Sequence, residues 1–303
     1  MSSLLAVSNS LAETVEQAGS AVVAINAGTR ISSSGIHWHH GIIITSDESL
    51  QRYDEITVTL SDGRSVPVTF LGHDPSTDIA VFQLQDVEIP VAKIGDATTL
   101  KVGHLVLGLA RSREGDLRAA MGAISVITGA WQSISGGKID QFIRPDINLY
   151  PGFAGGPLVD VSGDVVGMNT SGRRGTALTI PTATVNRVVE QLVAKGRISR
   201  GYLGLGMQSV RLPDNLKTTL NLTSAGGVIV VNVEPSGPAD NSGVLLGDVL
   251  VTFDGVNVSD TGDVLALLNN SDRIGKNVKV QVVRGGVLVE LALTVGERPT
   301  KED

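Results

Sequence analysis

The 303-residue sequence contains no cysteine, few aromatic residues and no long apolar run. Without cysteine, the chain has no disulfide, no thiolate zinc site and no cysteine nucleophile. Aromatic residues make up only 3% of the chain, no basic run is interleaved with them, and the net charge is −7, so nucleic acid is not an expected partner. No stretch reaches the roughly 20 apolar residues that cross a bilayer, so no membrane span is expected.

A basic segment is also missing from the N-terminus, where a secretory signal would begin. The first basic residue is Arg30, far beyond the position at which the positive region of a signal peptide stands. As written, the sequence therefore predicts a cytoplasmic protein. A periplasmic location is the alternative if a leader has been removed.

Glycine and aliphatic residues, by contrast, are abundant. The chain has 36 glycines and 42% hydrophobic residues. Short apolar runs broken by turns fill most of residues 20–180, for example AVVAI (21–25), GIIIT (41–45), IAVFQL (79–84) and DVVGMN (164–169). Strands of this length and density without helices between them predict antiparallel barrels, so we expect a mostly β protein.

Two helical patterns frame this β-rich region. Ser10 and Glu13 fit the S-x-x-E capping box, which predicts a first helix that begins at Ser10 and ends near Gly19. An apolar stripe with a repeat near 3.6 residues predicts a second helix over residues 185–195, followed by Gly196 as the terminating glycine.

The segment after the second helix is polar and marked by glycine, which indicates a domain boundary near residue 200. The remainder consists of short strands and two short helical segments, a pattern typical of a small separate unit. We therefore expect one domain over residues 1–198, a second over residues 199–298 and a charged tail over residues 299–303.

Three segments carry a family resemblance, in the order GIIITSDESL (41–50), HDPSTDIAVFQL (73–84) and FIRPDINLYPGFAGGPLVD (142–160). They resemble the HtrA/Deg family of trypsin-like serine proteases, in which the corresponding segments carry a histidine, an aspartate and a serine. The later segments RGYLGLGM (200–207) and PSGPADNSGVLLGDVLVTFDGVNV (235–258) resemble the PDZ domain that follows the protease in that family. The resemblance implies a trypsin-like double β-barrel followed by a PDZ domain.

Carried over residue by residue, the resemblance places Glu48 at the histidine position, Asp78 at the aspartate position and Ala154 at the serine position. Alanine offers no nucleophile. A glutamate, with a usual pKa of about 4.3, is a weak base for an alcohol, and here it would stand beside a second carboxylate. We therefore expect a pseudoprotease that is not an enzyme. The alternative is an active-family serine endopeptidase in an inactivated variant.

Several of these site residues have a simpler explanation as parts of the framework. The turn at Gly152 and Phe153 is either an oxyanion-type anion-binding turn or a structural glycine turn. Asp78 either retains the orienting position of a triad or only begins a strand. A hydrolytic site rebuilt around His73 or His104 is a further alternative.

The segment IHWHHG (36–41) holds three of the five histidines. On a strand, His37 and His39 share one face, and an H-x-H pair can bind Zn²⁺ or Cu²⁺ with help from a carboxylate such as Glu48. The alternative is a solvated or partner-facing strand whose histidines bind nothing. Because no third ligand is identifiable, we expect no metal and no other cofactor, and His37 and His39 remain candidates only.

In the PDZ-like unit, the resemblance implies that the C-terminus of a peptide adds a strand and that backbone N–H groups hold its carboxylate. Arg200 either adds positive charge to this site or forms an ion pair in the linker. Three apolar residues of the second helical segment either line the side-chain pocket or belong to the core. The candidate residues are Tyr202, Leu203, Gly204 and Leu205 in the loop, Arg200 before it, and Val264, Leu267 and Leu268 in the helix.

The function predicted from the sequence is therefore binding. The PDZ domain would capture protein or peptide C-termini, and the barrels would act as a scaffold, a chaperone-like surface or an accessory subunit. The resemblance further implies a homo-oligomer, with a trimer as one form. The remaining alternative is a structural subunit of a larger complex in which the barrel surfaces make the contacts, with metal bound through His37 and His39.

Overall fold

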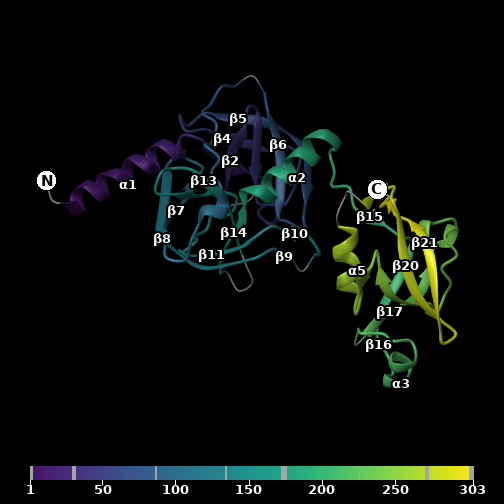
Figure 1. The fold of residues 1–303 in the computed structure, drawn as a ribbon. Helices are drawn as coiled ribbons and strands as arrows, with labels where there is room; N and C mark the ends of the chain where they lie inside the picture. Colours follow the sequence, from purple (N-terminus) through teal and green to yellow (C-terminus); the bar gives the residue numbers. More distant parts are fainter. Residues whose placement is uncertain are drawn as a thin grey trace. The chain divides into compact units, whose positions relative to one another are not determined.

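The computed structural model describes residues 3–28, 32–85, 87–133, 135–171, 176–224, 226–269 and 273–299. The chain divides into two compact units, and the division falls between Ile198 and Ser199. The first unit holds two closed β-barrels and the second holds a separate β-sheet with short helices (Figure 1). The predicted mostly β fold, a trypsin-like double barrel followed by a smaller domain, is confirmed.

The first barrel consists of six strands, each antiparallel to its neighbours. Alternate side chains along these strands point inward, so that Ile25, Ile43 and Phe82 are buried in one apolar cluster. In order around the barrel, the strands are β1 (Val22–Asn26), β2 (Ser33–His39), β3 (Ile42–Thr45), β6 (Ile79–Leu84), β5 (Ser65–Asp74) and β4 (Thr57–Thr59).

The second barrel repeats this architecture, and the two barrels share a core. The shared apolar cluster includes Ile44 of the first barrel, together with Leu107 and Met168 of the second. In order around the second barrel, the strands are β11 (Phe142–Asp146), β14 (Ala177–Pro181), β13 (Val165–Ser171), β12 (Pro157–Asp160), β7 (Leu105–Arg111) and β8 (Leu117–Thr128). Smaller elements are the 3₁₀-helices η1 (Asp47–Ser49) and η2 (Ala97–Thr99) and the two-stranded pair β9 (Trp131–Gln132) and β10 (Lys138–Ile139).

Helix α2 (Thr182–Lys195) packs on the shared core through the apolar stripe that predicted it. Val185, Val188 and Leu192 are fully or almost fully buried. The helix ends at Gly196, whose φ is 70° and whose N–H donates to the carbonyl of Leu192 over 2.8 Å. The second predicted helix is therefore confirmed, with three further residues at its start.

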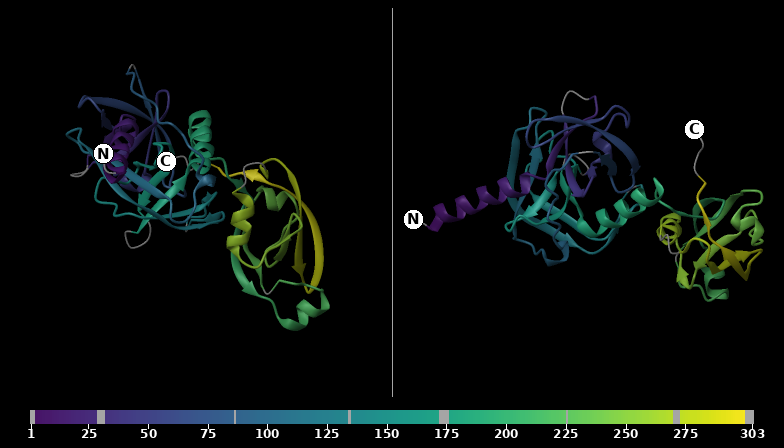
Figure 2. Two further views of the ribbon diagram at one scale, coloured as in Figure 1. Left: turned by 60° about the vertical axis from the view of Figure 1, so that its left-hand side comes forward. Right: turned by 90° about the horizontal axis from the view of Figure 1, so that it is seen from above.

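Helix α1 (Ser3–Gly19) begins earlier than the sequence predicted. Ser10 lies inside the helix, and its carbonyl accepts the hydroxyl of Thr14 over 2.9 Å, so the predicted start at Ser10 is wrong. The residues before it include leucine and alanine, which favour helix and contain no breaker. The second half of α1 packs on the shared core, whereas the first half is exposed and extends away from the barrels (Figures 1 and 2).

The second unit is a twisted antiparallel sheet with short helices. Helix α5 (Thr261–Leu268) begins with a capping box formed by Asp260 and Asp263. Helix α3 was not predicted, because none of its six residues is buried and it therefore has no apolar stripe. The strands of the sheet are, in order, β16 (Leu205–Arg211), β17 (Gly226–Val233), β18 (Val249–Phe253), β20 (Asn277–Arg284) and β21 (Val287–Thr294), and β19 (Val256–Asn257) also pairs with β18. A separate pair is formed by β15 (Gly201–Tyr202) and β22 (Gly296–Glu297). The helices are α3 (Asp214–Thr219), α4 (Pro238–Asn241) and α5 (Thr261–Leu268).

A buried arginine fastens three segments of the first unit together. Arg111, at the end of β7, is only 5% exposed. Its Nε donates to the carbonyl of Val22 over 2.5 Å, and its two terminal nitrogens donate to the carbonyls of Gly115 and Gly19, each over 2.6 Å. Burial lowers the pKa of Arg111, although the negative charge of Asp116 acts in the opposite direction. The guanidinium thus satisfies three carbonyl groups that no neutral apolar side chain could satisfy.

We expect Arg111→Met to lower the free energy of unfolding by about 3 kcal/mol, because three backbone carbonyls lose a charged donor. Urea unfolding followed by circular dichroism measures this loss. Arg64→Met is the control, since Arg64 is exposed and pairs only with Asp62 among the described residues, and it should change stability by less than about 0.5 kcal/mol. Equal stability of the two variants would contradict the anchoring role.

Candidate functional site

The carboxylate of Asp78 lies at the junction of the two barrels. Asp78 precedes β6 and is 8% exposed. Its Oδ2 accepts the hydroxyl of Ser46 over 2.7 Å and the hydroxyl of Thr170, and its Oδ1 accepts the backbone N–H of Glu48 over 2.7 Å. Because Ser46 and Glu48 follow β3 of the first barrel and Thr170 lies on β13 of the second, one carboxylate binds donors from both barrels.

The structure thus brings two of the three predicted triad positions into direct contact. Glu48 meets Asp78 through its backbone, while its own side chain is exposed on η1. The backbone of Asp78 has a φ of 58°, a left-handed conformation that costs energy for a residue other than glycine. We take this conformation as part of what aims the carboxylate at its donors.

The loop that carries Ala154 is held against the same junction. The Ala154 carbonyl accepts the N–H of Ser34 over 3.0 Å, and the N–H of Gly155 donates to the carbonyl of Asn169 over 2.8 Å. Asn169 directly precedes Thr170, which binds Asp78. Gly155 has a φ of 81°, and a Cβ there would overlap the backbone of Ser34 and the hydroxyl of Thr45, so glycine is required.

The turn at Gly152 and Phe153 is strongly fixed by the framework. The Gly152 carbonyl accepts the hydroxyl of Ser34 over 2.7 Å, and the N–H of Phe153 donates to the carbonyl of Tyr150 over 3.1 Å. Phe153 itself is 2% exposed. Since the amide of Phe153 is already bonded, an oxyanion-type role of this turn would fall to the amides of Gly152 and Ala154.

Burial dominates the electrostatics at Asp78 and raises its pKa to about 6. The hydrogen bonds from Glu48, Thr170 and Ser46 act in the opposite direction, and the negative charge of Glu48 adds to the rise. Asp78 therefore titrates well above an ordinary aspartate.

A cavity of about 380 Å³ opens beside Asp78. Trp131 and Phe142 form one wall, with their rings edge to face and their centroids 5.4 Å apart. Glu48 and Asp78 lie at its border. The cavity can hold an apolar side chain next to two carboxylates, but positions 48 and 154 supply neither an imidazole nor a hydroxyl to attack a peptide bond. Ile139, Leu178 and Ile180 contribute further apolar lining.

A histidine–carboxylate pair lies close to the site, and sequence reasoning did not identify it as a pair. The Nδ1 of His73 is 2.8 Å from Oδ1 of Asp47, and the hydroxyl of Tyr53 donates to the same oxygen over 2.9 Å. Burial, with Asp47 adding to it, raises the pKa of Tyr53 to about 12. The carboxylate that His73 contacts is 26 residues away in the sequence and lies on η1, so the sequence around His73 does not reveal it. His104, the other candidate for a rebuilt site, is exposed and directly precedes β7.

His37 is not available as a metal ligand. It is 1% exposed, its Nδ1 lies 2.9 Å from the carbonyl of Pro90, and its Nε2 accepts the N–H of Gly41 over 3.0 Å. Burial lowers its pKa, so the ring stays neutral with both nitrogens bonded. His39 is exposed at the end of β2, and among the described residues no three His, Asp or Glu side chains are grouped to hold a metal ion. The candidate pair fails because a bulge between the two histidines separates their environments.

In the second unit, hydrogen bonds to the rest of the domain hold the predicted carboxylate-binding loop in place. Gly204 has a φ of 71°, and its carbonyl accepts the N–H of Glu234 over 2.8 Å. The carbonyl of the buried Leu203 accepts the N–H of Ala239 over 2.9 Å. The hydroxyl of Tyr202 donates to Glu234 over 2.8 Å, which raises the pKa of Tyr202. Both loop carbonyls are therefore bonded to the domain.

The remaining candidates of this groove divide into core and surface. Val264 and Leu268 are buried in the apolar core of the unit, whereas Leu267 is only partly buried against it. Leu205 is the first residue of β16. Helix α5 is bonded to this strand, because the N–H of Thr261 donates to the hydroxyl of Ser209 over 3.1 Å. Arg200 contributes its carbonyl to the N–H of Arg298 over 2.9 Å. The peptide-binding roles of these residues remain predictions.

Comparison with known proteins agrees with this architecture. Residues 28–168 match the trypsin-like peptidase domain and residues 201–295 match the PDZ domain. The fold and these two matches define a trypsin-like peptidase domain followed by a PDZ domain. The chain belongs to the HtrA/Deg family, as the relatives below show.

Two curated relatives are named probable periplasmic serine endoproteases, DegP-like. One, from Pseudomonas savastanoi pv. phaseolicola, is 32% identical over 265 residues, which is 86% of this chain and 54% of the relative. The other, from Chlamydia pneumoniae, is 31% identical over 272 residues, 87% of this chain and 54% of the relative. This chain thus spans about half the length of the curated relatives it matches.

Solved structures cover almost the whole chain. A serine-to-alanine variant of the HtrA-type protease AlgW with a decapeptide has a TM-score of 0.80 at 26% identity and covers 96% of this chain and 98% of its own. The serine endoprotease from Yersinia pestis has a TM-score of 0.75 at 26% identity and covers 95% of this chain and 98% of its own.

Among the helices that the structure describes, none has the length and apolar character that crossing a membrane requires.

These relatives contradict the expectation that the chain is not an enzyme. Proteins about 30% identical over most of its length are named serine endoproteases, and the structural neighbours are proteases of the HtrA type. The prediction of a pseudoenzyme is therefore wrong. That prediction rested only on Glu48 and Ala154, and two substituted positions do not remove a chain from an endoprotease family.

We expect the stability of the first unit to fall as the pH rises from about 4 to 6. The folded-state pKa of Asp78 is about 6, above the unfolded value of about 4, so the folded state binds more protons in this window. The loss should total about 2–3 kcal/mol and should be absent in Asp78→Asn. Urea unfolding between pH 4 and 7.5 measures it, with the exposed Asp54→Asn as control. Parallel curves for Asp78→Asn and the parent would contradict this expectation.

Proposed function

We propose that this protein is a serine endopeptidase of the HtrA type in an inactivated variant, and that its PDZ domain recruits peptide substrates. The retained framework carries the proposal. Asp78 still binds donors from both barrels, and the loop at Ala154 still docks beside it. The names of the relatives support the same activity.

The framework suits acyl transfer once two side chains are supplied. A hydroxyl at position 154 would be the nucleophile, and an imidazole at position 48 would take its proton. Asp78 would hold that imidazole in orientation, because its carboxylate is already fixed by Ser46 and Thr170. The amides of Gly152 and Ala154 would stabilise the oxyanion. With Glu48 and Ala154 in these places, the chain keeps the positioning groups and lacks the two reacting ones.

The PDZ domain supplies the binding step in this proposal. Two structural neighbours are described with bound peptides, a decapeptide and a tripeptide. In this chain, Leu205 begins the strand to which a peptide would add, directly after Gly204, and Leu267 is partly exposed on α5. The scaffold, chaperone-like and accessory roles, and assembly as a trimer or within a larger complex, stay predictions.

The names of the relatives also bear on location. They support a periplasmic protein, the alternative considered for this sequence, and they do not support the cytoplasmic location. We therefore include the periplasm in the proposal.

The double variant Glu48→His with Ala154→Ser should cleave an unfolded, fluorescently labelled protein. Each single variant should be at least about 10³-fold slower, because triad members act as a unit. Gel analysis of the fragments, together with labelling of position 154 by a fluorophosphonate, measures the outcome. Asp54→His combined with Ala154→Ser is the matched control and should stay unlabelled. A folded double variant that neither cleaves nor labels would refute the endopeptidase proposal.

Peptide binding can be tested separately at the PDZ loop. Amidation of a peptide's C-terminus should weaken binding at least about tenfold, because charge-assisted hydrogen bonds to the carboxylate are lost. Gly204→Ala should weaken it similarly, since a Cβ there lies 3.1 Å from a Glu234 oxygen. Gly255→Ala carries similar backbone strain, with a φ of 75° against 71°, but meets nothing within 4 Å, so it should bind normally. Fluorescence anisotropy that shows no difference between these two variants would exclude the loop as the site.

A further inference from the structure

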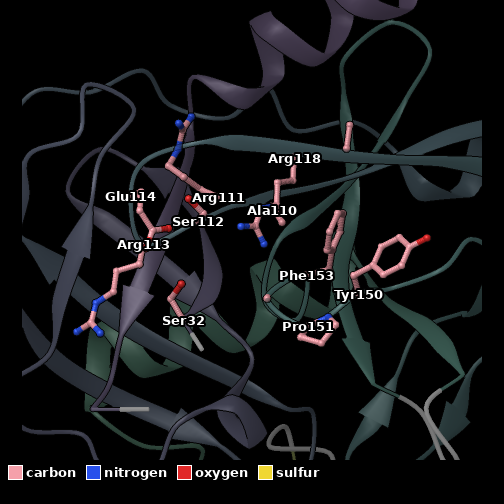
Figure 3. Close-up of a pocket in the computed structure, with 12 residues that line it drawn as sticks. Ser32, Ala110, Arg111, Ser112, Arg113, Glu114, Arg118, Tyr150, Pro151 and Phe153 are labelled. Carbon is pink, nitrogen blue, oxygen red and sulfur yellow. The ribbon is translucent and has the colours of Figure 1, made fainter. Parts of the chain in front are cut away.

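A second cleft lies in the first unit, at the outer side of the loop that leads to Ala154 (Figure 3). Its volume is about 640 Å³, within the range of small-ligand and peptide-side-chain sites. One wall is the turn between β7 and β8, and the other is the segment from Tyr150 to Phe153. The cleft does not include Asp78 or any residue of the PDZ domain.

The wall formed by the turn is basic. The cleft is lined there by Arg111, Arg113 and Arg118 and by one carboxylate, Glu114. A second carboxylate of the turn, Asp116, contacts Ser112 and does not line the cleft. The guanidinium of Arg111 donates to three backbone carbonyls, so it is already occupied within the framework. Arg118 is exposed and reaches toward the middle of the cleft, whereas Arg113 extends along its outer edge (Figure 3).

The one acid that lines the cleft does not neutralise the arginines of this wall. The pKa of Glu114 is lowered first by hydrogen bonds from its own backbone and from Ser112, and only then by the charges of Arg118 and Arg113. In the described residues, neither arginine forms an ion pair with a carboxylate within 4.0 Å. The guanidinium of Arg118 therefore has donors to offer a ligand, and carboxylate is a group that its planar fork recognises well.

The opposite wall is aromatic. Tyr150 is 58% exposed, and its ring lies beside that of Phe153, with centroids 6.2 Å apart. Pro151 stands between them in the chain, next to the cleft. An exposed aromatic surface facing a guanidinium accommodates a ligand with an apolar part beside its negative charge.

Both walls are fixed to each other by one buried hydroxyl. Ser34 is 0% exposed, and its Oγ accepts the N–H of Arg111 over 3.0 Å and donates to the carbonyl of Gly152 over 2.7 Å. The turn and the loop are thereby held at a set separation. A cleft held open in this way binds without first paying the entropy of ordering its walls.

We propose that this cleft binds an acidic segment of a peptide. A glutamate or aspartate carboxylate pairs with Arg118, with Arg113 adding long-range attraction, and a neighbouring apolar side chain lies against the exposed ring of Tyr150, which Phe153 supports from the interior. Nucleic acid fits less well, because the chain carries a net charge of −7 and the basic surface comprises only these few side chains. The site goes beyond the proposed function, since it requires neither peptide-bond cleavage nor the PDZ groove.

The test uses the full chain and a fluorescent peptide whose N-terminus is acetylated and whose C-terminus is amidated, so that the PDZ loop has no carboxylate to hold. The peptide contains two glutamates that alternate with leucines, and its twin contains glutamines instead. Anisotropy at about 50 mM salt should show the glutamate peptide binding at least about tenfold more tightly than its twin, and the difference should shrink as salt screens the charges.

Variants then locate the binding. Arg118→Gln should abolish the preference for glutamate, Arg113→Gln should reduce it about threefold, and Arg118→Lys should keep part of it because the charge remains. Lys279→Gln, which changes an exposed cation of the second unit that pairs with Glu290, is the control and should bind as the parent does. Equal affinity for the two peptides, or an Arg118→Gln variant that still prefers glutamate, would overturn the proposal. A single-stranded oligonucleotide that binds more tightly than the glutamate peptide would also overturn it.

Discussion

The carboxylate of Asp78 is the interaction on which the site in the first unit depends. It is almost fully buried, yet it binds a hydroxyl from each barrel and an amide from the first. Losing any of these donors would leave a buried carboxylate short of partners, which is more costly than losing an exposed bond. The relative placement of β3, β6 and β13, and with it that of positions 48, 78 and 154, is therefore constrained by one group of atoms.

The fold was largely readable from the sequence because its signals are local and periodic. The apolar stripe before Gly196 predicts α2, and the short apolar runs predict strands of both barrels. The start of α1 was misplaced because S-x-x-E also occurs inside helices, where nothing in the local sequence distinguishes it from a cap. Helix α3 escaped prediction because it packs none of its residues into the core.

The site was readable only in part, for a physical reason. The resemblance located Glu48, Asp78 and Ala154, but the groups that hold them are distant in sequence: Ser34 fastens the loop, and Thr170 binds the carboxylate. Such partners are set by how strands pair, and no spacing rule reveals them. The histidine pair on β2 shows the reverse case, because a two-residue periodicity suggested a shared face, whereas one ring is buried and bonded at both nitrogens. The expectation of a non-enzyme failed for a related reason, since it inferred the class of the whole chain from two side chains.

The bond between Glu48 and Asp78 uses the backbone of residue 48 and leaves its side chain in solvent. Any amino acid other than proline can donate that N–H. At position 154, the carbonyl contacts Ser34, and the loop is anchored by the glycine that follows. At the two positions that would react, the bonds to the framework described above are therefore made by backbone groups and not by side chains. A scaffold of this kind can exchange its reacting groups by single substitutions, in evolution or at the bench, while its folding free energy and its neighbouring binding surfaces change little.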